Sequence, residues 1–94
     1  MLLTKKFILY HELIGLKVRI LSHSDPTLIG KSGIVIDETL NTLVILDGSK
    51  NRKIRVSKYY GVFEFELPSK ERVIVDGVLL HGRPEDRLKR MLRR

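Results

Sequence analysis

Short runs in which apolar and polar residues alternate recur along this chain at intervals of about ten residues. Alternation places successive side chains on opposite faces of an extended strand, and clusters of turn-forming residues separate the runs. Strands are expected at Leu16–Leu21, Ile34–Asp37, Thr42–Leu46, Arg52–Ser57, Val62–Leu67 and Arg72–Asp76. Six short strands joined by turns predict an all-β fold, a small, strongly bent antiparallel barrel whose closure would remove exposed strand edges.

The centre of the chain predicts a tightly turned β-hairpin. Ile34 and Ile36 point to one side of their strand, and Val35 and Asp37 point to the other. The next strand, Thr42–Leu46, is apolar on both faces, which is typical of a strand that is covered on both sides. We therefore expect this hairpin at the heart of the sheet.

An N-terminal helix is expected over residues 1–15. Thr4 can cap it, and Gly15 stands where the residue after a helix belongs. Its apolar stripe consists of Leu3, Phe7, Tyr10 and Ile14. A small barrel has little interior left for this stripe, so we expect it to form an interface with a partner protein. The alternative is that the helix plugs one open end of the barrel.

A basic C-terminal helix is expected over residues 83–94. Pro84 suits its first position, and the acidic residues of the first turn and the basic residues of the last turn suit the helix dipole. The alternatives are a disordered tail or, less well supported by its thin apolar stripe, a membrane-surface helix. With a barrel over residues 16–76, the 94 residues form one domain.

The net charge of +7 is concentrated in one strand region and one tail. Lys50–Lys58 contains five basic residues and no acidic residue, and Arg83–Arg94 contains six basic residues against two acidic ones. Lys53 and Arg55 alternate with inward-facing residues, so both could contact phosphates about 6–7 Å apart. The residues expected to bind RNA are Lys17, Arg19, Lys31, Arg52, Lys53, Arg55, Lys58, Arg83, Arg87 and Arg90. The alternative is an ordinary solvated surface.

The sequence lacks the residues that several kinds of chemistry need. The absence of cysteine excludes disulfides, cysteine-type zinc sites and thiol catalysis. The N-terminus predicts neither a signal peptide nor a membrane span. His11, His23 and His81 have no metal-ligand spacing. Glu64 and Glu66 share a strand face and could hold Mg²⁺ or act as acid and base, but a solvated face or cross-strand pairing with basic residues is more typical. We expect no catalytic residue and no metal ligand.

Five sequence blocks carry a resemblance to a known family. They are Gly30–Thr39 followed by Asn41-Thr42-Leu43, His11–Leu16, Val62–Pro68, Asp76-Gly77 and Gly82–Arg87. The blocks occur in the family's order, and the stretch between the first and the last of them spans nearly the whole chain. On these blocks the sequence resembles archaeal ribonuclease P (RNase P) protein component 1, the Sm-like subunit related to the eukaryotic 29-kilodalton-class RNase P protein.

The resemblance implies an Sm-like or SH3-like fold and a subunit of the endonuclease, a hydrolase, that removes the 5′ leader from precursor tRNA. In this family the RNA does the chemistry, so the chain is expected to be a non-catalytic subunit without a cofactor, while the RNA needs Mg²⁺. The implied partners are the specificity domain of RNase P RNA, a zinc-ribbon subunit that forms a heterodimer with this chain, and other RNase P proteins. A cytoplasmic location is expected.

Two other functions remain compatible with the residues alone. One is a general Sm-like or ribosomal RNA-binding module without preference for RNase P RNA. The other is a standalone nuclease that would use Glu64, Glu66 and Asp76 around a metal ion.

Overall fold

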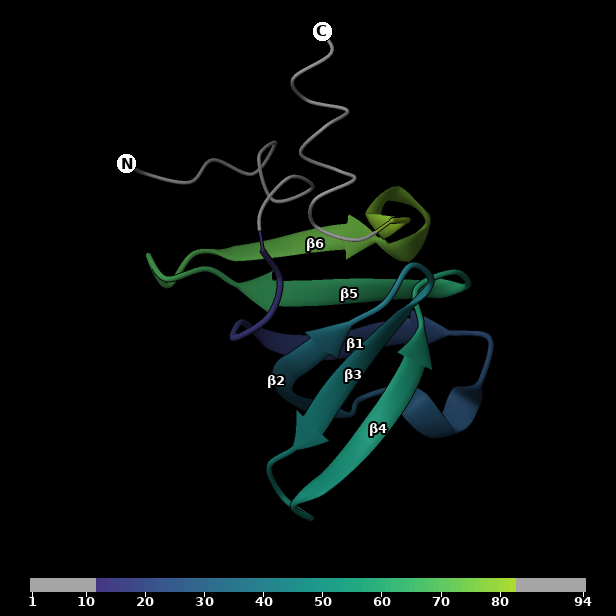
Figure 1. Cartoon of the computed structure of the whole chain (residues 1–94), viewed down its shortest axis with the longest axis horizontal. Helices are drawn as coiled ribbons and strands as arrows, with labels where there is room; N and C mark the ends of the chain where they lie inside the picture. The colour runs from purple at the N-terminus through teal and green to yellow at the C-terminus, as the bar shows by residue number, and fades with distance from the viewer. Residues whose placement is uncertain (1–11, 83–94) are drawn as a thin grey trace, which may run out of the picture.

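The computed structural model of the protein describes residues 12–82 (Figure 1). Its elements are β1 (Lys17–His23), η2 (Pro26–Leu28), β2 (Ser32–Glu38), β3 (Thr42–Asp47), β4 (Arg52–Ser57), β5 (Gly61–Glu66), β6 (Arg72–Asp76) and η3 (Gly77–Leu80), where η marks a 3-10 helix. The expected helix over 83–94, most of the expected helix over 1–15, and the residues Leu3, Phe7, Tyr10, Arg83, Arg87 and Arg90 lie outside the described residues. The prediction of an all-β fold with six strands is confirmed.

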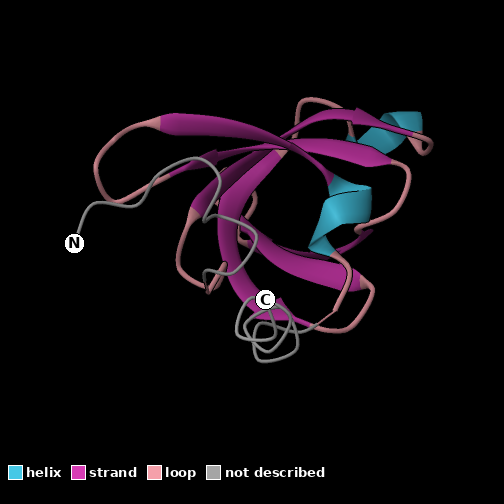
Figure 2. Cartoon of the chain, turned by 90° about the horizontal axis from the view of Figure 1, so that it is seen from above, coloured by secondary structure: helices cyan, strands magenta, loops and turns pink. Residues whose placement is uncertain are grey.

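The six strands form one antiparallel sheet in the order β4-β3-β2-β1-β5-β6. Figure 1 shows β6 at one end of this arrangement and β4 at the other, and Figure 2 shows the strands curving around one side. Within residues 12–82, β4 and β6 do not pair, so the prediction of a closed barrel was wrong. Both edge strands carry charged side chains, such as Lys53 on β4 and Arg72 on β6. Such charges oppose edge-to-edge pairing with another chain, so the sheet does not need to close into a barrel.

The core lies on the concave side of the sheet and follows the predicted alternation. On β5, Phe63 and Phe65 are fully buried, with Glu64 and Glu66 on the opposite face. On β3, Leu43 and Ile45 are buried, whereas Val44 and Leu46 point to the outer side and are only half-buried. The expectation that β3 is covered on both sides is therefore not met within the described part of the chain.

A register shift in β2 decides which of its residues enter the core. Val35 is completely buried, whereas Ile34 on the outer face is 42% exposed. The pairing with β3 then shifts between Val35 and Asp37, as at a β-bulge. The shift places Glu38 on the buried side at the end of the strand.

The segment before β1 is a turn between two core residues, Leu13 and Leu16. Leu13 is fully buried in the hydrophobic core, and the next residue, Ile14, is 43% exposed. Gly15 has a positive φ of 95°, which glycine adopts readily, and its amide donates to the Val35 carbonyl at 2.7 Å. Residues 12–15 are not helical, so the predicted helix is wrong at this end, and Ile14 lies in a turn rather than on a helical stripe.

Leu13→Ala is expected to lower the free energy of unfolding by about 2–3 kcal/mol, because a fully buried leucine leaves a cavity when it is truncated. Ile14→Ala is the matched control and should cost less than about 1 kcal/mol, because Ile14 is already partly in water. Urea unfolding followed by circular dichroism measures both variants. Equal losses would contradict the placement of Leu13 in the core.

Candidate nucleic-acid interface

The outer face of the sheet carries a row of side chains from four neighbouring strands. The register places Lys17 of β1 opposite Ile34 of β2, Ile34 opposite Leu46 of β3, and Leu46 opposite Lys53 of β4. Adjacent strands lie about 4.8 Å apart, so the row spans roughly 14 Å. Two exposed cations therefore flank two partly exposed aliphatic side chains, an arrangement that we call the outer-face row.

β4 extends the positive charge of this face. Lys53 and Arg55 are both exposed, and Val56 is fully buried on the other side of the strand. Ile54 is half-buried and packs against the core. The prediction that these two basic side chains share the outer face of their strand is confirmed, and Arg55 stands beside the half-buried Val44 of β3.

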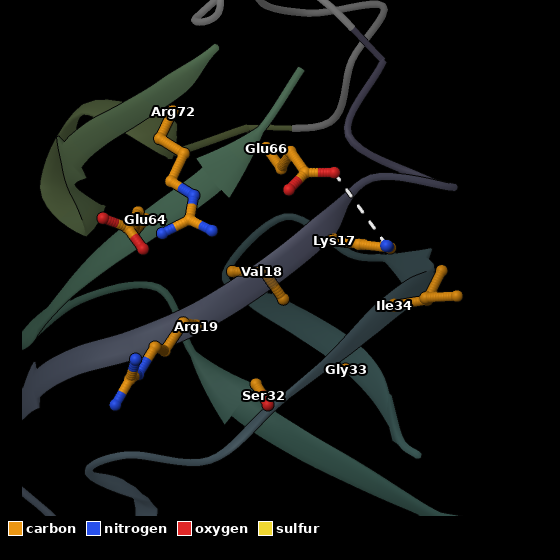
Figure 3. Close-up of a pocket in the computed structure, with 9 residues that line it drawn as sticks. All are labelled: Lys17, Val18, Arg19, Ser32, Gly33, Ile34, Glu64, Glu66 and Arg72. Carbon is orange, nitrogen blue, oxygen red and sulfur yellow. Dashed lines mark ion pairs between the residues drawn. The ribbon is translucent and has the colours of Figure 1, made fainter. Parts of the chain in front are cut away.

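A cleft of about 270 Å³ continues the outer face across β1, β2, β5 and β6 (Figure 3). Lys17 and Arg19 of β1 line it, and Arg19 stands opposite Glu64 of β5. The Lys17 ammonium lies 3.9 Å from the Glu66 carboxylate. Arg72 of β6 stands opposite Glu66 and completes the lining on that side. Sequence reasoning missed Arg72; its place on the polar face of a strand that follows two glutamates was the available signal.

Lys31 and Arg52 lie away from the outer-face row, beside a buried carboxylate. Lys31 and Asp47 both line a hollow of about 460 Å³ between the β1–β2 loop and the β3–β4 turn, and Arg52 stands opposite Asp47 in the β3–β4 ladder. Hydrogen bonds from the Ser49 hydroxyl and backbone N–H, with a smaller contribution from the Lys31 charge, hold the pKa of Asp47 below its ordinary value. The charge of Lys31 is thus set against a carboxylate at this end of the sheet.

Lys58 is not on the surface, so its assignment to RNA binding was wrong. Its side chain is completely buried, and its ammonium donates to the Glu38 carboxylate at 2.6 Å. It also donates to the carbonyls of Thr39 at 2.9 Å and Gly82 at 2.7 Å. An ammonium that is enclosed by a carboxylate and carbonyls has no access to a phosphate group.

The sequence contained a signal for this burial. Lys58 continues the inward period of two that begins with Ile54 and Val56, so the alternation itself points its side chain away from the outer face. The high density of basic residues in Lys50–Lys58 suggested that all of them are exposed, although the alternation places Lys58 on the inward side. Its partner Glu38 could not be foreseen, because the bulge in β2 turns that residue inward.

Comparisons with known proteins identify the group to which this chain belongs. A family profile described as "Ribonuclease P/MRP, subunit p29" matches residues 6–90. The chain is a member of the ribonuclease P/MRP subunit p29 family. The resemblance noted in the sequence blocks is thereby confirmed.

Curated relatives of this p29-family chain carry the name ribonuclease P protein component 1. The protein from Staphylothermus marinus is 52% identical over 90 residues, which are 96% of this chain and 97% of the relative. The protein from Methanocaldococcus jannaschii is 47% identical and covers 98% of this chain and 95% of the relative. A solved structure, titled as a homologue of the human RNase P protein Rpp29, has a TM-score of 0.60 and 47% identity, with 81% of this chain and 96% of that chain covered.

Asp76, His23 and His81 of this p29-family chain make local contacts in the described structure. The Asp76 carboxylate accepts from the Val78 amide at 3.1 Å and caps η3. The His23 ring lies 3.1 Å from the Ser57 carbonyl, and the His81 ring lies 2.8 Å from the Tyr59 hydroxyl. Within residues 12–82, no three His, Asp or Glu side chains come together as a potential metal site, and no helix has the length and apolar character to cross a membrane.

Proposed function

We propose that this p29-family protein binds RNase P RNA and supports removal of the 5′ leader from precursor tRNA. The observation that carries the proposal is the outer-face row with its extension on β4. Exposed cations from β1 and β4 suit phosphates, and the aliphatic side chains between them suit riboses and unstacked bases. The names of the relatives favour RNase P RNA among possible RNAs. A general Sm-like or ribosomal module has no observation in its favour beyond this same surface.

The proposal assigns chemistry to the RNA and recognition to the protein. Mg²⁺ is bound by the RNA of the holoenzyme, and this chain holds no cofactor of its own. Its partners are the specificity domain of the RNA, a zinc-ribbon subunit in a heterodimer and the other RNase P proteins, in an archaeal cytoplasm. The names of the curated relatives support the assembly, and the absence of cysteine suits a reducing compartment.

Salt dependence tests the RNA-binding surface. For the wild type we expect the logarithm of the association constant to fall with the logarithm of salt concentration with a slope of roughly −3 to −5, as for four to six neutralised phosphates. Replacing Lys53 and Arg55 together by glutamine should flatten that slope by up to about two units, because each exposed cation can neutralise one phosphate. Filter binding or fluorescence anisotropy with RNase P RNA measures the slope.

Lys70→Gln is the control, because its exposed ammonium lies in the turn between β5 and β6 rather than on β4. It should leave the slope nearly unchanged. An unrelated structured RNA of equal length should bind more weakly than RNase P RNA. Equal affinity for the two RNAs would favour the general RNA-binding module. An unchanged slope in the double variant would show that the RNA does not contact Lys53 and Arg55 on β4.

A further inference from the structure

The cleft on the outer face contains carboxylates in a place where a purely phosphate-binding surface would carry only cations. Two cross-strand rows meet there. One contains Arg72, Glu66 and Lys17, and the other contains Glu64 and Arg19. Figure 3 shows the guanidinium of Arg72 directed toward the Glu64 carboxylate, and Arg19 on the other side of β1. Carboxylates repel phosphates, so their presence calls for a ligand group that donates hydrogen bonds.

The two glutamates differ in how they are engaged. The Glu66 carboxylate lies 3.9 Å from the Lys17 ammonium and 4.0 Å from the Lys70 ammonium, so it is held between two cations. Glu64 takes part in no ion pair within the described part of the chain, although Arg19 stands opposite it in the ladder. Its side chain is half-buried and lines the cleft. Glu64 is therefore the less engaged of the two carboxylates that line the cleft.

The chemistry of a carboxylate selects among the groups that RNA offers. An ionised carboxylate has two acceptor oxygens and no donor. The Watson–Crick edge of guanine presents two adjacent donors, the ring N1–H and the exocyclic amino group, which match those two oxygens. Adenine, cytosine and uracil each present one donor group on that edge. The guanidinium planes of Arg19 and Arg72 line the same cleft and can stack on a base or meet its phosphate.

We propose that this cleft binds one unpaired guanine, with Glu64 reading its Watson–Crick edge. A volume of about 270 Å³ is large enough for a single base. A base that is paired within a duplex has its Watson–Crick edge occupied, so the ligand is a nucleotide in a loop, bulge or single strand. This inference rests on the proposed RNA-binding function and adds a preference for one base to a surface that otherwise meets the RNA backbone.

Short RNAs that differ at one position test the proposal. The full chain is titrated at low salt with fluorescent 12-nucleotide uridine RNAs that contain one central guanosine, inosine or adenosine. Inosine keeps the N1–H of guanosine and lacks its amino group. The guanosine RNA should bind at least about fivefold more tightly than either of the other two, as is typical of a bidentate contact to a base.

Variants then assign the preference to Glu64. Glu64→Gln keeps the size of the side chain but replaces one acceptor by a donor, so the preference for guanosine should fall below about twofold. Glu71→Gln removes an exposed carboxylate from the β5–β6 turn and should leave the preference intact. Replacing Lys53 and Arg55 by glutamine should lower the affinity for all three RNAs by the same factor, because those cations are expected to contact phosphates.

The outcomes separate this inference from the proposed function. Equal wild-type affinity for the three short RNAs would overturn the guanine site, while retained affinity for RNase P RNA would leave the proposed function in place. A preference that survives in Glu64→Gln would overturn the role of Glu64. Failure of the wild type to bind any of these RNAs, RNase P RNA included, would overturn the proposed function and with it the inference.

Discussion

Replacing Lys58 by methionine is expected to lower the free energy of unfolding by about 3–5 kcal/mol, the loss typical of breaking a buried ion pair. The ammonium of Lys58 and the carboxylate of Glu38 are both inaccessible to solvent and lie 2.6 Å apart. Methionine fills much of the same space but removes the Lys58 ammonium from a buried carboxylate. It also leaves the carbonyls of Thr39 and Gly82 without the donor that they now share.

Two further variants show whether the buried charge causes this loss. Lys53→Met makes the same substitution on the exposed face of β4 and should change stability by less than about 0.5 kcal/mol. Replacing Glu38 by leucine in the Lys58→Met background should recover at least about 1 kcal/mol, because the buried carboxylate that has lost the Lys58 ammonium is removed as well. Urea unfolding measures each variant. A loss below about 1 kcal/mol for Lys58→Met would show that the ammonium is not enclosed.

The Lys58 ammonium joins parts of the chain that are far apart in sequence. Through Glu38 and Thr39 it holds the end of β2 and the turn into β3, and through Gly82 it holds the segment that follows η3. The Gly82 amide also donates to the carbonyl of Leu40, in that same turn, at 2.9 Å. These contacts therefore tie the segment after η3 to the turn between β2 and β3.

Gly77→Ala is expected to cost about 3 kcal/mol or more, because the added methyl group has no space. A Cβ at this buried residue would overlap the carbonyl oxygen of Lys58 and lie 2.7 Å from a ring carbon of Phe63. Relief requires movement of backbone or of a core aromatic ring, and overpacking of this kind costs typically 1–3 kcal/mol and sometimes more. The expected value is at the high end since a backbone atom cannot rotate away.

Gly48→Ala is the matched control, because a Cβ at that turn residue would meet no atom within 4 Å. It should change the free energy of unfolding by no more than about 0.5 kcal/mol in either direction. Thermal and urea unfolding should rank the two alanine variants in the same order. Similar stability for both would show that the segment around Gly77 adapts freely, contrary to its close packing against Lys58 and Phe63.

The local pattern of the sequence determined the strands and the direction of most side chains. Alternation predicted the burial of Phe63 and Phe65 and the exposure of Lys53 and Arg55, because a strand turns successive side chains to opposite faces whatever its neighbours are. The expected strand bounds differ from the observed ones by at most two residues. The alternation of side chains along a strand does not depend on the partner strand, so strand positions and side-chain directions can be predicted from the sequence.

The tertiary structure alone decided which strands meet and how their faces align. Strand pairing brought Lys17 into one row with Lys53 and placed it opposite Glu66, across separations that no local pattern encodes. The bulge in β2 reversed the phase of the chain and turned Glu38 toward Lys58. Periodicity gives the phase of side chains within a strand, but register, bulges and edge pairing depend on contacts between distant segments. For that reason the open sheet, the cleft and the buried ion pair emerged only from the fold.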